Sequence, residues 1–127
     1  MWFGAGFGNP TMKGTYAIVV DGAAGDVTER SLGDHDPGQQ LAPSVTVLNN
    51  TVVNGIRTVV VTRTLAGASA QHYTFAAGAQ GVAMVAAVGS SPTFAYHKAR
   101  GSTTLMLVQV GSPMCICTKQ YPAVLFT

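Results

Sequence analysis

Turn-forming residues recur along this chain at intervals that leave room for strands but for few helices. Between these turns lie segments rich in β-branched and aromatic residues, at 16–20, 44–48, 56–65, 72–75 and 103–110. Asn54-Gly55 joins residues 45–53 to residues 56–65, and this dipeptide is typical of a type I′ hairpin turn because both positions tolerate a positive φ. The spacing of turns and segments predicts an all-β domain with roughly eight short strands, a β-sandwich or barrel.

The chain is long enough for one hydrophobic core. At 127 residues it would yield two poorly buried halves if divided, so a single domain is expected over residues 1–112. Residues 82–88 form the longest apolar run, and the flanking glycines favour a buried strand over a short helical turn. Residues 113–127 are expected to form a C-terminal tail or linker.

Charged residues are scarce, at 9% of the chain against roughly a quarter in a typical domain. Such a surface is expected to be covered by glycans, tandem domains or neighbouring copies of the chain. The net charge of +2 is too small and too dispersed for nucleic-acid binding. The longest apolar run is far shorter than the roughly twenty residues of a membrane-spanning helix, so no span is expected in this segment.

Two features point to the secretory pathway or the extracellular space. Asn49-Asn50-Thr51 is an acceptor sequence for N-glycosylation, with Asn49 as the modified residue. Cys115 and Cys117 are separated by one residue, which makes a bond between them strained. They would pair with cysteines outside this segment or remain as free buried thiols. The N-terminal residues lack the pattern of a signal peptide, so a removed leader or a longer parent chain is expected.

The sequence lacks the common catalytic arrangements. There is no Gly-x-Ser-x-Gly motif, and all five acidic residues lie in the first third of the chain, in or beside expected turns. The run of residues 34–38, Asp-His-Asp-Pro-Gly, could be drawn as a metal site but is better explained as a turn. Gly4 to Gly8 is not followed by a helix that could hold a phosphate. We therefore expect a domain without its own catalytic site.

One pair of side chains could carry chemistry of another kind. A methionine thioether with a histidine imidazole is an axial ligand pair for haem iron, and Met12 and His97 are candidates. By residue type alone, a core methionine and a structural histidine are the commoner explanations.

Several blocks of the chain resemble those of DOMON domains, in the same order. They are Trp2-Phe-Gly-Ala-Gly-Phe-Gly8, then Met12, Tyr16 to Val20, Leu32 to Gly38, Arg57 to Leu65, and Val85 to Gly89 leading to Tyr96-His97 and Arg100-Gly101. The resemblance covers roughly residues 2–110. It implies an immunoglobulin-like β-sandwich, secreted or lumenal, similar to the cytochrome domain of cellobiose dehydrogenase. This opening motif normally follows earlier strands, so the sandwich is expected to lack its first strand or strands in this chain.

The resemblance also implies a function. In haem-binding members of the family a methionine and a histidine ligate b-type haem, and these positions correspond to Met12 and His97. Because Cys-x-x-Cys-His is absent, the haem would be held non-covalently. Residues expected to line the slot or face the propionates are Trp2, Phe7, Met84, Phe94, Lys98 and Arg100, with Phe3 and Arg63 as further candidates. The expected activity is electron transfer to a redox partner protein or domain.

Two alternatives remain open at this stage. Some DOMON relatives lack haem and are thought to bind carbohydrate, for which Trp2, Tyr73 and Tyr121 are the large aromatic candidates. The domain could also be a structural repeat in an extracellular assembly.

Overall fold

The described part of the chain is built entirely from strands and the turns between them. The computed structural model describes residues 1–34, 36, 38–76, 81–91, 94–95 and 97–105, and these contain no helix. No segment of this part is therefore a helix suited to crossing a membrane. The eight strands are β1 (Trp2–Phe7), β2 (Tyr16–Val20), β3 (Val27–Ser31), β4 (Gln39–Gln40), β5 (Thr46–Val53), β6 (Ile56–Thr62), β7 (Val82–Gly89) and β8 (Ala99–Leu105).

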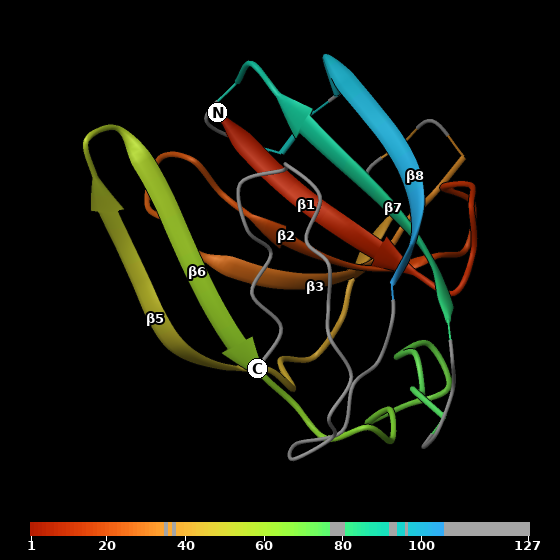
Figure 1. The fold of residues 1–127 in the computed structure, drawn as a ribbon. Coiled ribbons are helices and arrows are strands. Elements are labelled where there is room, and N and C mark those ends of the chain that lie inside the picture. The colour runs from red at the N-terminus through yellow and green to blue at the C-terminus, as the bar shows by residue number, and fades with distance from the viewer. Residues whose placement is uncertain (35, 37, 77–80, 92–93, 96, 106–127) are drawn as a thin grey trace.

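The strands form two antiparallel sheets, an arrangement consistent with the predicted β-sandwich. The larger sheet has six strands in the order β4-β3-β2-β1-β7-β8, and β5 and β6 form the smaller one. In Figure 1 the β5–β6 hairpin stands to one side of the larger sheet. The prediction of an all-β domain is confirmed.

Strand β1 lies inside the larger sheet, between β2 and β7. Its successive side chains point to opposite faces of the sheet. Gly4 is opposite Val19 of β2 and Ala87 of β7, so these three residues share one face. Phe7 is opposite Tyr16 and Met84, which share the other face. At these positions the first face carries small side chains and the second carries larger ones.

The β5–β6 hairpin turns at the predicted dipeptide. Asn54 and Gly55 have φ values of 52° and 76°, as a type I′ turn requires. The hairpin is tied to the β2–β3 turn because Asn50 Nδ2 donates to the Gly25 carbonyl at 2.7 Å. Arg57 Nη1 in turn donates to Asn50 Oδ1 at 2.7 Å.

Replacing Gly55 with alanine is expected to lower the free energy of unfolding by about 1 kcal/mol, because a Cβ disfavours the left-handed backbone. A Cβ at Gly55 would meet no heavy atom within 4 Å, so the cost is conformational and not steric. Urea denaturation measures the change, with Asn54→Gly as a control expected to be near neutral. An unchanged midpoint for Gly55→Ala would contradict the turn assignment.

The described strands differ from the expected ones in three places. The strand expected at residues 72–75 is wrong, because the His72 amide donates to the Ser69 carbonyl and the chain turns there. Strands β3 and β4 were not anticipated. The expected tail at residues 113–127, with Cys115, Cys117 and Tyr121, lies outside the described residues, as does most of the segment 103–110.

Candidate functional site

A cavity of about 500 Å³ lies on the small-residue face of the larger sheet. This volume is within the range of roughly 300–1,000 Å³ that is usual for small-molecule and cofactor sites. Strands β1, β2, β7 and β8 contribute residues to it, as do the loops that follow β1 and β7 and the chain after β3. The cavity thus joins segments from both ends of the described chain.

Glycine and alanine make up part of the floor of the cavity. Gly4 and Gly6 come from β1, Ala17 from β2, Ala87 from β7 and Gly101 from β8. A Cβ on Gly6 would lie 2.9 Å from methyl groups of both Thr15 and Val85, too close for an ordinary contact. The close approach at Gly6 explains why β1 carries a glycine there.

Aromatic and aliphatic side chains build the walls. The rings of Trp2 and Phe94 meet edge to face, with their centroids 4.8 Å apart. Trp2 is buried together with Ala17, Val19 and Leu32, and Met12 and Phe94 pack against this cluster. The guanidinium carbon of Arg30 lies 4.8 Å from the Phe94 ring centroid, which places a cation beside this wall. The walls are therefore mostly apolar.

Met12 is presented by a hydrogen-bonded loop between β1 and β2. Its carbonyl accepts from the Thr15 amide at 3.0 Å, and the Gly14 amide donates to the Leu32 carbonyl at 2.8 Å. Asn9 Oδ1 accepts from both the amide and the hydroxyl of Thr11. Gly8 and Gly14 have positive φ at either end of the loop. These bonds fix the backbone from which the thioether reaches the cavity.

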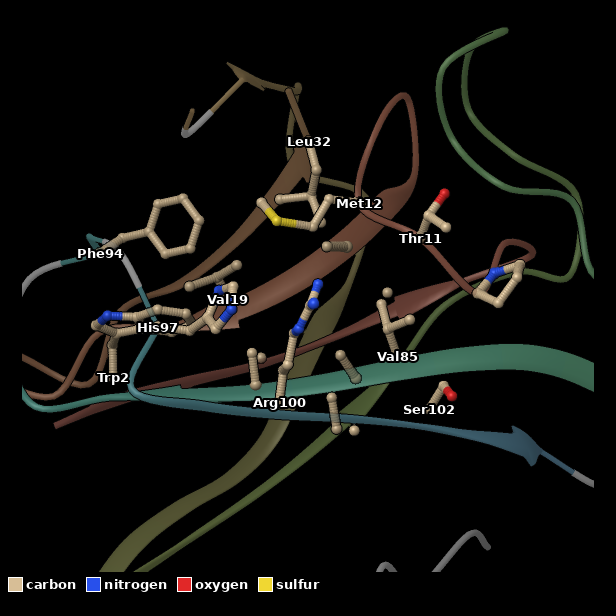
Figure 2. Close-up of a pocket in the computed structure, with 18 of the residues that line it drawn as sticks. Trp2, Thr11, Met12, Val19, Leu32, Val85, Phe94, His97, Arg100 and Ser102 are labelled. Carbon is tan, nitrogen blue, oxygen red and sulfur yellow. The ribbon is translucent and has the colours of Figure 1, made fainter. Parts of the chain in front are cut away.

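His97 and Arg100 reach the same cavity from the other end of the chain. The Lys98 amide donates to the Val88 carbonyl at 2.9 Å, which holds the approach to β8 against the end of β7. Figure 2 shows the side chains of Met12, His97 and Arg100 extending toward one space above the strands, with Trp2 and Phe94 on the His97 side. A thioether, an imidazole and a guanidinium thus share one mostly apolar cavity.

The structure brings together five of the eight residues predicted for this site: Trp2, Met12, Phe94, His97 and Arg100. Phe7, Met84 and Lys98 are not among the lining residues. Phe7 packs on the opposite face, where its ring centroid is 5.4 Å from that of Phe75. Met84 is opposite Phe7 in the register and shares that face.

The two further candidates, Phe3 and Arg63, also lie outside the lining. The guanidinium carbon of Arg63 lies 5.0 Å from the Tyr16 ring centroid, on the Tyr16 face of the sheet.

Sequence reasoning missed several lining residues, among them Val19, Leu32 and Val85. The signal that could have identified the two valines is the two-residue repeat of a strand, which places alternate side chains on the same face. Val19 shares a face with Ala17 on β2, and Val85 shares one with Ala87 on β7. Leu32 follows β3, a strand that the sequence did not reveal.

A buried polar cluster occupies the opposite face of the sheet. Glu29, at 2% exposure, accepts hydrogen bonds from the Tyr16 hydroxyl at 2.5 Å, the Ser44 hydroxyl at 2.5 Å and the Val45 amide at 3.2 Å. The Ser44 amide also donates to it. Burial alone would raise the pKa of Glu29, but the hydrogen bonds from Ser44 and Tyr16 outweigh it and lower the pKa. Glu29 is therefore an anion at neutral pH.

This cluster joins the sheet to the segment that enters the hairpin. Burial, followed by the hydrogen bond and the charge of Glu29, raises the pKa of Tyr16 above its ordinary range, so its hydroxyl remains a donor. His72 is fixed by Ser69 Oγ at 2.7 Å from Nδ1 and by the Ala42 carbonyl at 2.9 Å from Nε2. These groups have structural partners, which explains their burial without a catalytic role.

The described part of the segment at residues 34–38 agrees with the turn interpretation. Asp36 Oδ1 accepts from the Gly38 amide at 2.8 Å, and Gly38 has a φ of 63°. His35 and Pro37 lie outside the described residues. Among the described residues no cluster of three or more histidine, cysteine or acidic side chains could hold a metal ion.

The chain was compared with protein-family models, curated proteins and solved structures. Neither a protein-family model, a curated protein nor a solved structure matches this chain.

Proposed function

We propose that this chain is a b-type haem-binding electron-transfer domain, with Met12 and His97 as the axial ligands. The observation that carries the proposal is the convergence of these two side chains, 85 positions apart, on one apolar cavity. A thioether sulfur and an imidazole nitrogen form an axial pair that binds low-spin haem iron. When bound, haem supplies one-electron exchange at its iron.

The shape and polarity of the cavity also support the proposal. A floor of glycine and alanine between the Trp2–Phe94 wall and the Met12 loop suits a flat, largely apolar group. Arg100 brings a cation to the cavity, where it can pair with the carboxylates that such a group carries. The loops that carry Met12 and His97 are both anchored by backbone hydrogen bonds, so the ligands would be held in place before binding.

If Met12 and His97 both bound the iron, they would leave no open position for a substrate. The proposed activity is therefore electron transfer to a partner protein or domain in the extracellular space or the secretory lumen. Carbohydrate binding through an exposed aromatic platform receives less support, because Trp2 is buried in the wall of the cavity.

Filling the cavity is expected to abolish haem binding without unfolding the chain. Ala87 is partly buried and lies on the floor, so Ala87→Phe would place a ring in the space that the haem requires. Absorbance titration of the purified chain with haem should show stoichiometric binding by the wild type and none by Ala87→Phe.

Ala83→Phe is the matched control, because Ala83 lies on the same strand and, by alternation, on the same face as Ala87 but does not line the cavity. It should bind haem as the wild type does. Circular dichroism verifies the fold of each variant. Equal haem binding by a folded Ala87→Phe chain would place the haem elsewhere and overturn the proposal.

A further inference from the structure

The β5–β6 hairpin exposes apolar side chains to an unusual extent. Every residue of β5 is exposed, and Val53 and Ile56 have exposed fractions of 64% and 69%. The β5–β6 sheet has no third strand among the described residues. A two-stranded hairpin with apolar faces and open edges is marginally stable in water and invites association with another strand.

The glycosylation sequence Asn49-Asn50-Thr51 lies within this hairpin. Asn49 is opposite Val60, Thr51 is opposite Thr58 and Val53 is opposite Ile56. Since alternate residues share a face, Asn49, Thr51 and Val53 lie on the same face as Ile56, the most exposed large apolar residue of the described part of the chain. A group attached to Asn49 would emerge beside these apolar side chains.

The other face of the hairpin is the one tied to the body of the domain. Asn50 Nδ2 donates to the Gly25 carbonyl and Asn50 Oδ1 accepts from Arg57, so this amide is committed to internal contacts. Asn49 points to the opposite side, away from these contacts. The register also shifts between Val47 and Asn49, so the strand is irregular immediately before the acceptor residue. Asn49 and Thr51 are both exposed.

We infer that Asn49 carries an N-linked glycan, and that this glycan covers the outer edge of β5 and the hairpin face that carries Asn49, Thr51, Val53 and Ile56. The modification would form a bond from Asn49 Nδ2 to C1 of an N-acetylglucosamine donated by a lipid-diphosphate-linked oligosaccharide. The bond from C1 to the diphosphate oxygen breaks, the lipid diphosphate leaves with its electron pair, and the amide nitrogen loses one proton.

A bulky polar group at this position would also compensate for the scarcity of charge on the hairpin itself. Edge strands are commonly protected by charged side chains, but Arg57 is the only charged residue in the hairpin. A hydrated glycan would protect the edge in the same way, because it would prevent a second strand from pairing with the hairpin. This inference is independent of haem binding.

The test is expression of the full chain behind a cleavable leader in a eukaryotic secretory system, followed by intact-mass analysis of both secreted and cell-retained protein. The wild type should carry a glycan mass that peptide N-glycosidase removes, leaving aspartate at position 49. Asn49→Gln and Thr51→Ala should lack this mass. Thr51→Ser retains a hydroxyl at the same position and should keep it. An unmodified Asn49 in the wild type would overturn the inference.

A second experiment tests whether the glycan prevents association through the hairpin. Sedimentation velocity of Asn49→Gln should show association, whereas the glycosylated wild type should be monomeric. Ile56→Lys in the Asn49→Gln background should restore the monomer. A monomeric Asn49→Gln chain would show that the hairpin needs no glycan or is covered by another part of the chain. Association of the glycosylated wild type through this face would assign it to a second copy. Either result would contradict the covering role.

Discussion

Replacing His97 with alanine is expected to weaken haem binding by at least about 100-fold, because an axial ligand is lost while the apolar walls remain. Absorbance titration measures the affinity, and the residual complex should change from a low-spin to a high-spin spectrum. Added imidazole should restore the low-spin form by occupying the space left by the side chain.

Two companion variants make this prediction specific. Met12→Leu keeps the bulk that packs against the buried cluster but removes the sulfur, so it should retain haem while losing the six-coordinate spectrum. Lys98→Ala is the control, because Lys98 is adjacent to His97 in sequence but does not line the cavity. A low-spin spectrum that persists in His97→Ala without added imidazole would exclude His97 as a ligand.

Replacing Glu29 with glutamine is expected to lower the free energy of unfolding by about 2–4 kcal/mol at neutral pH. The Tyr16 hydroxyl, the Ser44 hydroxyl and the Ser44 and Val45 amides all donate to this carboxylate. A glutamine presents one oxygen and an amide group that is itself a donor, so some of these buried donors lose their acceptor. Urea denaturation measures the loss, and Asp26→Asn is the control because Asp26 is exposed.

The same residue predicts how stability depends on pH. The pKa of Glu29 is lowered in the folded chain, so its contribution is fully present above the carboxyl group's ordinary pKa. It is lost as the pH falls through the lower, folded value. The wild type should therefore lose stability on acidification, and Glu29→Gln should lose less. Parallel curves for the two chains between neutral and acidic pH would contradict an anionic Glu29.

Strands with a strong local signal could be predicted from the sequence. Asn54-Gly55 identified the hairpin because two adjacent positive φ values favour these residue types. Residues 82–88 were predicted as a strand from their apolar run and flanking glycines, and β7 covers them. Strand β3 gave no such signal, because its central Glu29 reads as a surface residue. Glu29 can be buried only because Tyr16 of β2 and Ser44, in the segment before β5, donate hydrogen bonds to it.

The types of residue that form the candidate site could be predicted from the sequence, but the face of the sheet on which each side chain lies could not. Trp2 and Phe7 are five positions apart on one strand, so they must lie on opposite faces, and only Trp2 lines the cavity. Met84 and Val85 are separated in the same way on β7. Deciding which face holds the cavity required the register between β1, β2 and β7, which depends on contacts between residues distant in sequence.

The most direct test of the central claim is the absorption spectrum of the wild-type chain saturated with haem b, recorded in the oxidised state, in the reduced state, and in the reduced state under carbon monoxide. With Met12 and His97 both bound to the iron, the spectrum should be that of a six-coordinate, low-spin haem in both oxidation states, and carbon monoxide should change it little. A high-spin spectrum, or prompt and complete formation of the carbon monoxide complex, would contradict bis-axial ligation and the assignment of this domain as an electron carrier.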